Sequence, residues 1–515
     1  MPHDHLKINQ IKVGSILSYL QIALNVIIGI VYTPVMLRLL GRNEYGLYNT
    51  VASTISMLSI LNLGFNSSYI RYYSKYKKND DKESIYKLNG LFIIIFAVIG
   101  LIALVCGGFL SFNLDIVFDN GLTSEEYDTA RILMLLLTVN LAVSFPMSVF
   151  QSIISAHERF VFLKLLGMLK TVLSPLLTLP LLLFGYKSVA LVAVTLAVQL
   201  LTDIIYFVYV VFKLKNKFVF HGFEPGIMKS LFIYTGFIAI NMIVDQINWN
   251  VDKLLLGRYK GTATVAVYSV GFSLHHYYNM FSKSVSSLFT PKVHMIINKY
   301  SNDIAERNRV LTELFVKVGR IQFIILALIG SGLVFFGRQF IYFWAGPDYS
   351  DAYYVTLLLT LPSTIALIQN LGIEIQRAEN NHRFRSIVYL FMALLNLGIS
   401  IVLCQLYGAV GAAIGTAFAL IVANGIIMNI FYHMRCGINI LEFWKNILRV
   451  SCGLIPPIIA GILLNHFIEY DTLLKLAAAI SVYTVIYCLS MRFLGMNDYE
   501  KKMVDQPIMK LLKRK

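Results

Sequence analysis

Charged residues are scarce in this chain. Only 14% of its 515 residues are Asp, Glu, Lys or Arg, whereas 57% are hydrophobic. Soluble domains carry about 25% charged residues, because a surface in contact with water has to be polar. The shortage excludes an ordinary soluble protein and predicts a protein that is embedded in a membrane.

Cysteine pairs and the common catalytic motifs are missing as well. The five cysteines lie in or beside apolar runs and form no CxxC pair, so we expect small buried side chains and neither disulfides nor metal ligands. The sequence contains no GxxxxGK[ST], no HExxH and no GxSxG, which are the motifs of P-loop ATPases, zinc proteases and serine hydrolases. We therefore predict no enzymatic activity, no cofactor and no bound metal.

Long apolar runs follow one another along the whole chain. Each has about the ~20 residues that a helix needs to cross a bilayer, and a helix satisfies its own backbone hydrogen bonds in lipid. The sequence predicts an all-α polytopic membrane protein with fourteen transmembrane helices. The expected spans are 12–38, 46–70, 88–112, 129–154, 160–184, 188–212, 228–255, 263–290, 313–336, 353–376, 383–405, 408–433, 446–467 and 471–494.

Lysine and arginine are unevenly distributed over the segments between these spans. With the N-terminus placed inside, most of the 44 Lys and Arg residues lie in the two terminal segments and in the loops on the inner side. Cytoplasmic loops retain Lys and Arg, so both termini are predicted to be cytoplasmic. The net charge of +16 then reflects topology and does not indicate nucleic-acid binding.

A sequence repeat divides the chain. Residues 39–42 and 255–258 both read LLGR, and further matches follow in the same order with nearly the same offset. They pair Tyr48 with Tyr268, Phe160 with Phe384, and Gly185 with Gly408. Such matches are typical of a duplicated unit of six helices, and paired repeats in transporters hold the substrate between them. The glycine after each Leu-Leu is expected to end a helix at the outer surface.

The repeat predicts three parts of the chain. Residues 1–215 are expected to form an N-lobe and residues 216–435 a C-lobe, each with six helices. Because six is an even number, both copies enter the membrane from the same face. Residues 436–515 are expected to supply the last two helices and a basic cytoplasmic tail.

Polar residues recur in four of the spans, namely 12–38, 46–70, 228–255 and 263–290, which are equivalent positions of the two copies. Polar groups inside a membrane are costly and usually face a cavity or a partner. We therefore predict a wet central cavity between the lobes. Its expected lining is Asn25, Tyr32, Asn62, Asn66, Arg71, Asn241, Asn248, Tyr268, His275, His276, Asn279 and Lys283.

Three charged residues are candidates for a coupling-ion site or a charge pair: Asp245, Asp252 and Lys170. Asp245 is expected deep in its span, as a proton or cation site or as the partner of a lysine such as Lys170 or Lys283. Asn, Ser and Gln often join transmembrane helices without touching a substrate. That second explanation stays open for each uncharged polar residue above.

The segment YTPVMLRLLGRNEYGLYNTVAS at 32–53 resembles the bacterial polysaccharide flippases (Wzx-like) of the multidrug/oligosaccharidyl-lipid/polysaccharide exporter superfamily. The resemblance is carried by Pro34, Leu40, Gly41, Glu44, Tyr45, Gly46, Leu47 and Tyr48, and by Asp252, Leu255, Leu256 and Gly257. It implies a flippase in the bacterial cytoplasmic membrane that moves undecaprenyl-diphosphate-linked oligosaccharide to the outer leaflet by alternating access, for the synthesis of a surface polysaccharide. Membrane lipids, H⁺ or Na⁺ and a polysaccharide polymerase are the implied partners.

The resemblance also implies a cationic cavity, in which Arg71 and Lys283 would bind the diphosphate. Asp245 and Asp252 depart from that pattern, because carboxylates repel phosphate unless they are paired or protonated. Two relatives of the same superfamily remain alternatives, a cation-coupled multidrug antiporter and a lipid II flippase. A polysaccharide polymerase or ligase is disfavoured, because no large outer loop is expected.

Overall fold

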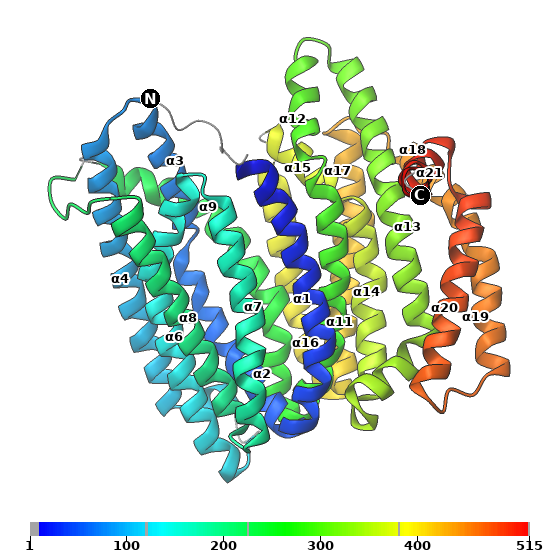
Figure 1. Ribbon diagram of the computed structural model, residues 1–515, viewed down its shortest axis with the longest axis horizontal. Coiled ribbons are helices and arrows are strands. Elements are labelled where there is room, and N and C mark those ends of the chain that lie inside the picture. Colours follow the sequence, from blue (N-terminus) through cyan, green and yellow to red (C-terminus); the bar gives the residue numbers. More distant parts are fainter. Residues whose placement is uncertain (1–9, 119–121, 224–225, 380–381, 513–515) are drawn as a thin grey trace. The chain divides into compact units, whose positions relative to one another are not determined.

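The computed structural model describes residues 10–118, 122–223, 226–379 and 382–512, and the regular secondary structure in these ranges is entirely helical (Figure 1). Helices occupy all fourteen predicted positions, which confirms the all-α polytopic membrane protein. They are α1 (Gln10–Leu40), α2 (Arg42–Met57) with α3 (Phe65–Lys78), α4 (Lys82–Phe112), α6 (Ser124–Ala156), α7 (Phe160–Leu183), α8 (Lys187–Val208), α9 (Ile227–Gln246) with α10 (Asp252–Lys260), α11 (Thr262–Ser287), α13 (Ile304–Ala345), α14 (Ala352–Ile368) with α15 (Leu371–Ala378), α16 (His382–Leu420), α17 (Met428–Met434), α18 (Ile440–Ser451) with α19 (Ile455–Phe467), and α20 (Leu473–Ser490).

Nine helical stretches in the described ranges are long and apolar enough to cross a membrane, or ten if the bent pair of α14 and α15 is one span. One of the nine, Arg383–Met434, covers two predicted spans. The helices at the predicted spans 46–70, 228–255 and 263–290 are not among those that the described residues contribute. These are three of the four spans in which polar residues recur.

Several expected spans are interrupted inside the membrane. Leu63 and Gly64, with φ of 48° and 76°, separate α3 from the 3-10 turn Leu58–Asn62 that follows α2. A π-helical segment, Ile247–Val251, joins α9 to α10, and α14 meets α15 at a bend of 46°. Broken helices and π-segments frequently mark functional sites in helical membrane proteins.

The backbone supports the sequence repeat but corrects its alignment. Gly41 ends α1 with φ 77° and ψ 170°, and Gly261 ends α10 with φ 79° and ψ 174°. The prediction that Gly257 ends a helix is therefore wrong: Gly257 lies inside α10, and the helix continues to the next glycine. Gly41 and Gly261 are spaced like Tyr48 and Tyr268, so the recurrence of LLGR is out of register with the structural repeat.

The second glycine pair keeps its predicted place. Gly185 follows α7 with φ 86°, and Gly408 adopts φ 57° at a kink within α16. Both glycines lie between the fifth and sixth helix of their copy, where the chain reverses direction. Only glycine adopts such left-handed conformations without steric cost.

The chain forms two compact units: residues 1–269 with 404–408 (unit 1), and residues 270–403 with 409–515 (unit 2). Unit 1 thus contains α9, α10 and the start of α11, which the sequence repeat assigns to the second copy. The lobe boundaries at 215 and 435 follow the repeat and stay a prediction.

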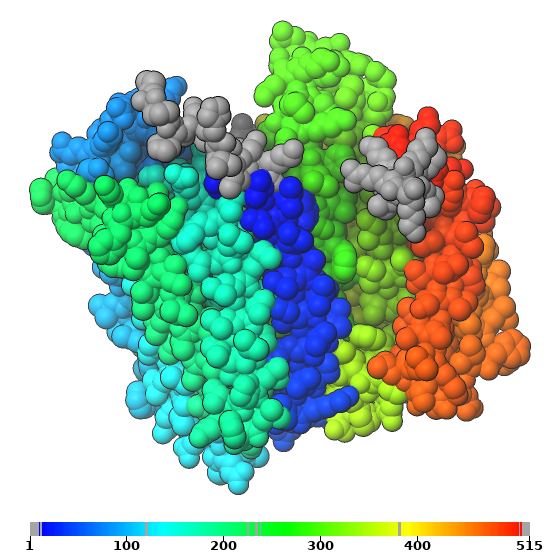
Figure 2. Space-filling model, viewed as in Figure 1, coloured from blue at the N-terminus to red at the C-terminus, as the bar shows by residue number. Residues whose placement is uncertain are grey.

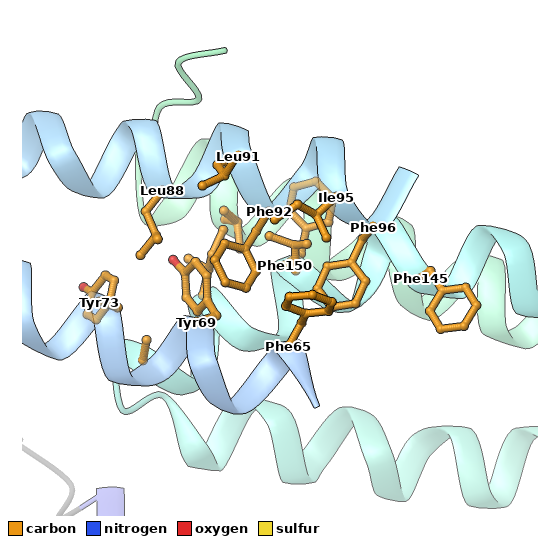
Figure 3. Packing of buried hydrophobic residues seen from close by; sticks show 14 of the residues in the cluster. Phe65, Tyr69, Tyr73, Leu88, Leu91, Phe92, Ile95, Phe96, Phe145 and Phe150 are labelled. Atoms are coloured by element: carbon orange, nitrogen blue, oxygen red, sulfur yellow. The ribbon is translucent and has the colours of Figure 1, made fainter. Parts of the chain in front are cut away.

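Within unit 1, α6 lies between α4 and α8, and α7 packs against α1 and α8 (Figure 1). A cluster of buried aromatic rings joins α3 to α4, as Figure 3 shows. The rings of Tyr69 and Phe92 meet edge to face with centroids 5.2 Å apart. Figure 2 shows α7 on the surface of this unit, and only 6% of its most apolar stretch is buried, as expected for a helix that contacts lipid.

In unit 2, α13 packs against α14, α18 and α20. The core of this unit centres on Phe315 and Phe443, whose rings lie 4.9 Å apart. A further helix, α21 (Asp498–Leu512), follows α20 and occupies part of the predicted tail.

Candidate functional site

The predicted residues on α1 contact α7. Asn25 accepts a hydrogen bond of 2.8 Å from the Thr171 hydroxyl, and Tyr32 lies beside Thr178. Both partners belong to unit 1, in which α1 and α7 pack along their length. These two polar residues therefore join neighbouring helices, whatever else they contact during transport.

The break between α2 and α3 presents two asparagines. The side-chain oxygen of Asn66 accepts hydrogen bonds of 3.3 Å from Ser148 and Ser152 of α6. The side-chain oxygen of Asn62 is buried and has no hydrogen-bond partner among the described residues. A buried polar atom without a partner is costly, so Asn62 is the group at this break that is best suited to receive a donor from a ligand. Arg71 is exposed on α3.

The polar stripe on the seventh span divides into two parts. Asn241 and Asp245 are exposed on α9, and Asn248 is half-buried in the π-segment. Asp252 is only 4% exposed and accepts a hydrogen bond of 2.7 Å from the Tyr268 hydroxyl. The structure thus brings two of the predicted residues together as a buried pair between α10 and α11, and it leaves Asp245 as the accessible carboxylate of the stripe.

An adjacent face of the same helix carries polar residues that the sequence analysis missed. Gln246 donates to the Ser59 hydroxyl at 2.8 Å and accepts from Asn250 at 2.5 Å. Gln246 and Asn250 are four residues apart, which is the spacing of helix neighbours. That spacing was the signal that could have revealed them.

Lys170 belongs to a bridged charge pair. Its ammonium group contacts the side-chain oxygen of Gln199 on α8. The amide nitrogen of Gln199 lies 2.9 Å from each carboxylate oxygen of Asp203, which is 4% exposed. Gln199 and Asp203 were not among the predicted site residues, although they too are four residues apart on one helix.

In unit 2, the predicted residues of α11 fall on two faces. His275 is buried, and its Nε2 lies 2.8 Å from the side-chain nitrogen of Asn279. His276 and Lys283 are exposed on the other side of the helix. The described residues hold no group of three His, Cys, Asp or Glu side chains that is arranged for a metal ion.

A buried serine holds α11 to its neighbours in unit 2. Ser282 donates to the Leu367 carbonyl at 3.0 Å and accepts from Gln322 of α13 at 3.0 Å. Asn370, at the bend between α14 and α15, also donates to it at 3.1 Å. Ser282 therefore serves helix packing and stabilises the bend.

One titratable cluster lies outside the membrane spans, in the connection between α6 and α7. His157 accepts or donates within 3.2 Å of the Tyr73 hydroxyl, and its Nδ1 lies 2.9 Å from the Ile153 carbonyl. Burial lowers the pKa of His157, and the positive charges of Lys77 and Arg159 act in the same direction.

Comparisons with known proteins agree with this architecture. Residues 12–290 match the family described as polysaccharide biosynthesis protein. No curated protein matches the sequence. The structure is similar to a lipid II flippase, MurJ, in an inward closed conformation, with a TM-score of 0.70, 16% identity, and coverage of 96% of this chain and 99% of that chain.

Multidrug transporters share the fold as well. An inward-facing multidrug resistance MATE transporter of the MOP superfamily has a TM-score of 0.61, 16% identity, and coverage of 84% of this chain and 99% of that chain. A MOP superfamily transporter from Pyrococcus furiosus has a TM-score of 0.56, 15% identity, and coverage of 84% and 96%. Since the family match at residues 12–290 spans more than half of the sequence, the chain belongs to the polysaccharide biosynthesis protein family, and it has the fold of MOP superfamily transporters.

Proposed function

We propose that this protein is a flippase of the bacterial cytoplasmic membrane, which moves an undecaprenyl-diphosphate-linked oligosaccharide from the inner to the outer leaflet for surface polysaccharide synthesis. The observation that carries the proposal is the family match over residues 12–290. It ties this MOP-type fold to polysaccharide synthesis rather than to drug export.

The polar helices give such a substrate its expected contacts. Arg71 and Lys283 are exposed, and a guanidinium or ammonium group forms strong, charge-assisted hydrogen bonds to a diphosphate. Exposed His276 and Asn241 offer groups that hydrogen-bond sugar hydroxyls. The pairing of Asp252 with Tyr268 accounts for one of the two carboxylates that would otherwise repel phosphate.

Exposed Asp245 favours a second candidate, a cation-coupled antiporter. A carboxylate on the accessible side of α9 would suit a cationic drug or a coupling H⁺ or Na⁺. Under the flippase proposal, Asp245 is assigned to the coupling ion; under the antiporter proposal, it would contact the drug.

Complementation separates the two candidates. The protein and its Arg71→Ala, Lys283→Ala and Asp245→Asn variants are expressed in a strain without its own repeat-unit flippase, and surface polysaccharide is measured. The proposal expects restoration by the native chain and loss in Arg71→Ala and Lys283→Ala. The matched controls Lys75→Ala and Lys292→Ala remove exposed lysines near the same helices and should restore fully. Drug resistance without polysaccharide, abolished by Asp245→Asn, would establish the antiporter instead.

A further inference from the structure

The family-like segment after α1 packs against the connection between α10 and α11 at very short range. A Cβ atom added to Gly46 would lie 1.8 Å from the carbonyl oxygen of Thr262. A Cβ added to Gly257 would lie 2.4 Å from a methyl carbon of Thr50, which is itself fully buried. The two segments therefore meet backbone to backbone, and only glycine fits at both positions.

Hydrogen bonds to this connection come from several helices. Arg42 Nε donates to the Ala263 carbonyl at 3.1 Å, and Thr262 donates to Glu126 at 2.8 Å. Arg258 donates to the carbonyl of Ile116 at 2.8 Å. All of these contacts lie within unit 1, at the end where α1 gives way to α2.

The rest of the motif holds the first copy to itself. Glu44 binds the hydroxyl of Ser188 and accepts from its backbone N–H at 3.4 Å, so it stabilises the N-terminus of α8. Tyr45 and Leu47 are buried, at 4% and 0% exposure. The motif thus has one face that is fixed within residues 1–215 and one glycine face that contacts residues 257–263.

These two segments belong to different copies of the duplicated unit. The Gly41 and Gly261 junctions are structural equivalents, so α2 begins the second helix of the first copy and α11 begins that of the second. Paired repeats in transporters move against each other during alternating access. Their contact at this end must therefore separate when the path on this side opens, and the charge distribution predicts that this side is the outer one.

We infer that Arg42, Gly46 and Thr50 on α2 form, with residues 257–263, a reversible latch that closes the outer side of the transport path. The inference rests on the proposed function for its direction of transport. The latch consists of glycine contacts and hydrogen bonds, mostly to carbonyl oxygens. Water can take over those hydrogen bonds when the segments part, so opening leaves no buried charge unpaired.

A disulfide across the latch tests this directly. In a chain whose five cysteines are replaced, Thr50→Cys and Gly257→Cys place their Cβ atoms 3.3 Å apart, close to the ~3.5–4.5 Å of disulfides. The matched control, Gly107→Cys with Thr138→Cys, also joins a glycine to a threonine, at 3.0 Å. It links α4 to α6, which lie within one copy and should not separate.

Oxidation is expected to abolish flipping in the Thr50→Cys/Gly257→Cys protein and reduction to restore it, while the control pair flips in both states. The latch is refuted if the Thr50–Gly257 disulfide forms completely and flipping continues. Restoration by reduction excludes misfolding as the cause of the loss. If the reduced protein does not flip at all, the proposed function fails, and the latch is judged by the next measurement alone.

That measurement needs no substrate. Thr50→Cys is exposed to a water-soluble thiol reagent in the Gly46→Ala background and in the Gly108→Ala background, since Gly108 is a helical glycine with open space around its Cβ position. Gly46→Ala should speed labelling by about tenfold, equivalent to about 1.4 kcal/mol of population shift toward the open state. Equal rates in the two backgrounds would overturn the latch.

Discussion

Two buried cation–carboxylate contacts, one in each unit, are built in opposite ways. In unit 2, Arg320 binds Glu500 directly through two hydrogen bonds of 2.7 and 2.8 Å, and the two side chains are 5% and 2% exposed. In unit 1, Gln199 stands between Lys170 and Asp203. One contact is a closed ion pair, and the other is a charge pair held apart by a neutral amide.

The surroundings explain the difference. The guanidinium of Arg320 also donates to the carbonyls of Asn446 and Gly495, both at 3.1 Å. Glu500 exchanges hydrogen bonds of 2.9 Å with the backbone and side chain of Asn497 at the start of α21. Every polar atom of the pair is thus occupied, as a buried ion pair requires. The contact fixes α21 to α13 and has no free position for a ligand.

The bridged pair is looser. Lys170 is half-buried, and its ammonium group can take up water if Gln199 moves away. Because an amide separates the charges, each can change its protonation state or its partner without the other losing a direct contact. The comparison indicates a structural clamp in unit 2 and a rearrangeable polar contact in unit 1.

Removing one partner of the clamp should have the largest effect. Arg320→Ala leaves Glu500 buried without its cation, which costs about 3–5 kcal/mol. Thermal unfolding in detergent measures the loss. The control is Arg309→Ala, whose exposed pairs with Glu306 and Glu313 are worth about 0–1 kcal/mol. Equal losses for the two variants would show that the buried pair is no clamp.

Replacing both partners sharpens the test. Arg320→Met with Glu500→Leu removes the charges together, and such exchanges are often neutral or stabilising by about 1–4 kcal/mol. The double variant should therefore recover most of the stability that Arg320→Ala loses. A loss as large as that of the single variant would mean that the hydrogen bonds to the carbonyls of Asn446 and Gly495 matter more than the charge pair.

Breaking the bridged pair should cost less. Asp203→Ala leaves the Gln199 amide without its acceptor, a cost of about 1–3 kcal/mol, while Lys170 remains able to hydrate. Gln199→Leu removes the bridge but keeps both charges. If the pair is rearrangeable, Gln199→Leu should reduce transport in the complementation assay more than it reduces the melting temperature. A loss of stability equal to that of Arg320→Ala would remove the distinction between the two contacts.

The smallest effect is expected from a contact without a charge. Because the pKa of His157 is lowered in the folded protein, its neutral form stabilises the fold. That contribution is complete above the unfolded pKa of about 6.5 and is lost as the pH falls through the lower folded value. His157→Gln should flatten this part of the stability profile below pH ~6.5. An unchanged profile would show that another group titrates there.

The sequence identified what depends on local pattern. Apolar length located all fourteen helices, and the glycines at 41, 185 and 408 marked real reversals of the chain. LLGR misled because four letters recur easily in a leucine-rich chain, whereas the backbone repeats at Gly261. Gln199 and Asp203 had a readable spacing on one helix, but nothing in the sequence shows that they face Lys170 on another.

The Arg320–Glu500 clamp was out of reach for the same reason. Its partners are far apart in the chain, and the segment after the last span was interpreted by its charge alone as a basic tail. Asn497 and Glu500 have the spacing of a helix-capping pair, which could have predicted α21. No local pattern could have predicted its docking on α13.

The clamp also has a consequence for synthesis. Glu500 follows Arg320 by 180 residues, so at ~5–20 residues per second the arginine waits about 9–36 seconds for its carboxylate. During that interval α13 carries an unpaired cation in its membrane-spanning part, and α18 and α20 are not yet complete. Unit 2 therefore finishes folding only as translation ends, and a chain that stops before α21 exposes an uncompensated charge that quality-control proteases can recognise.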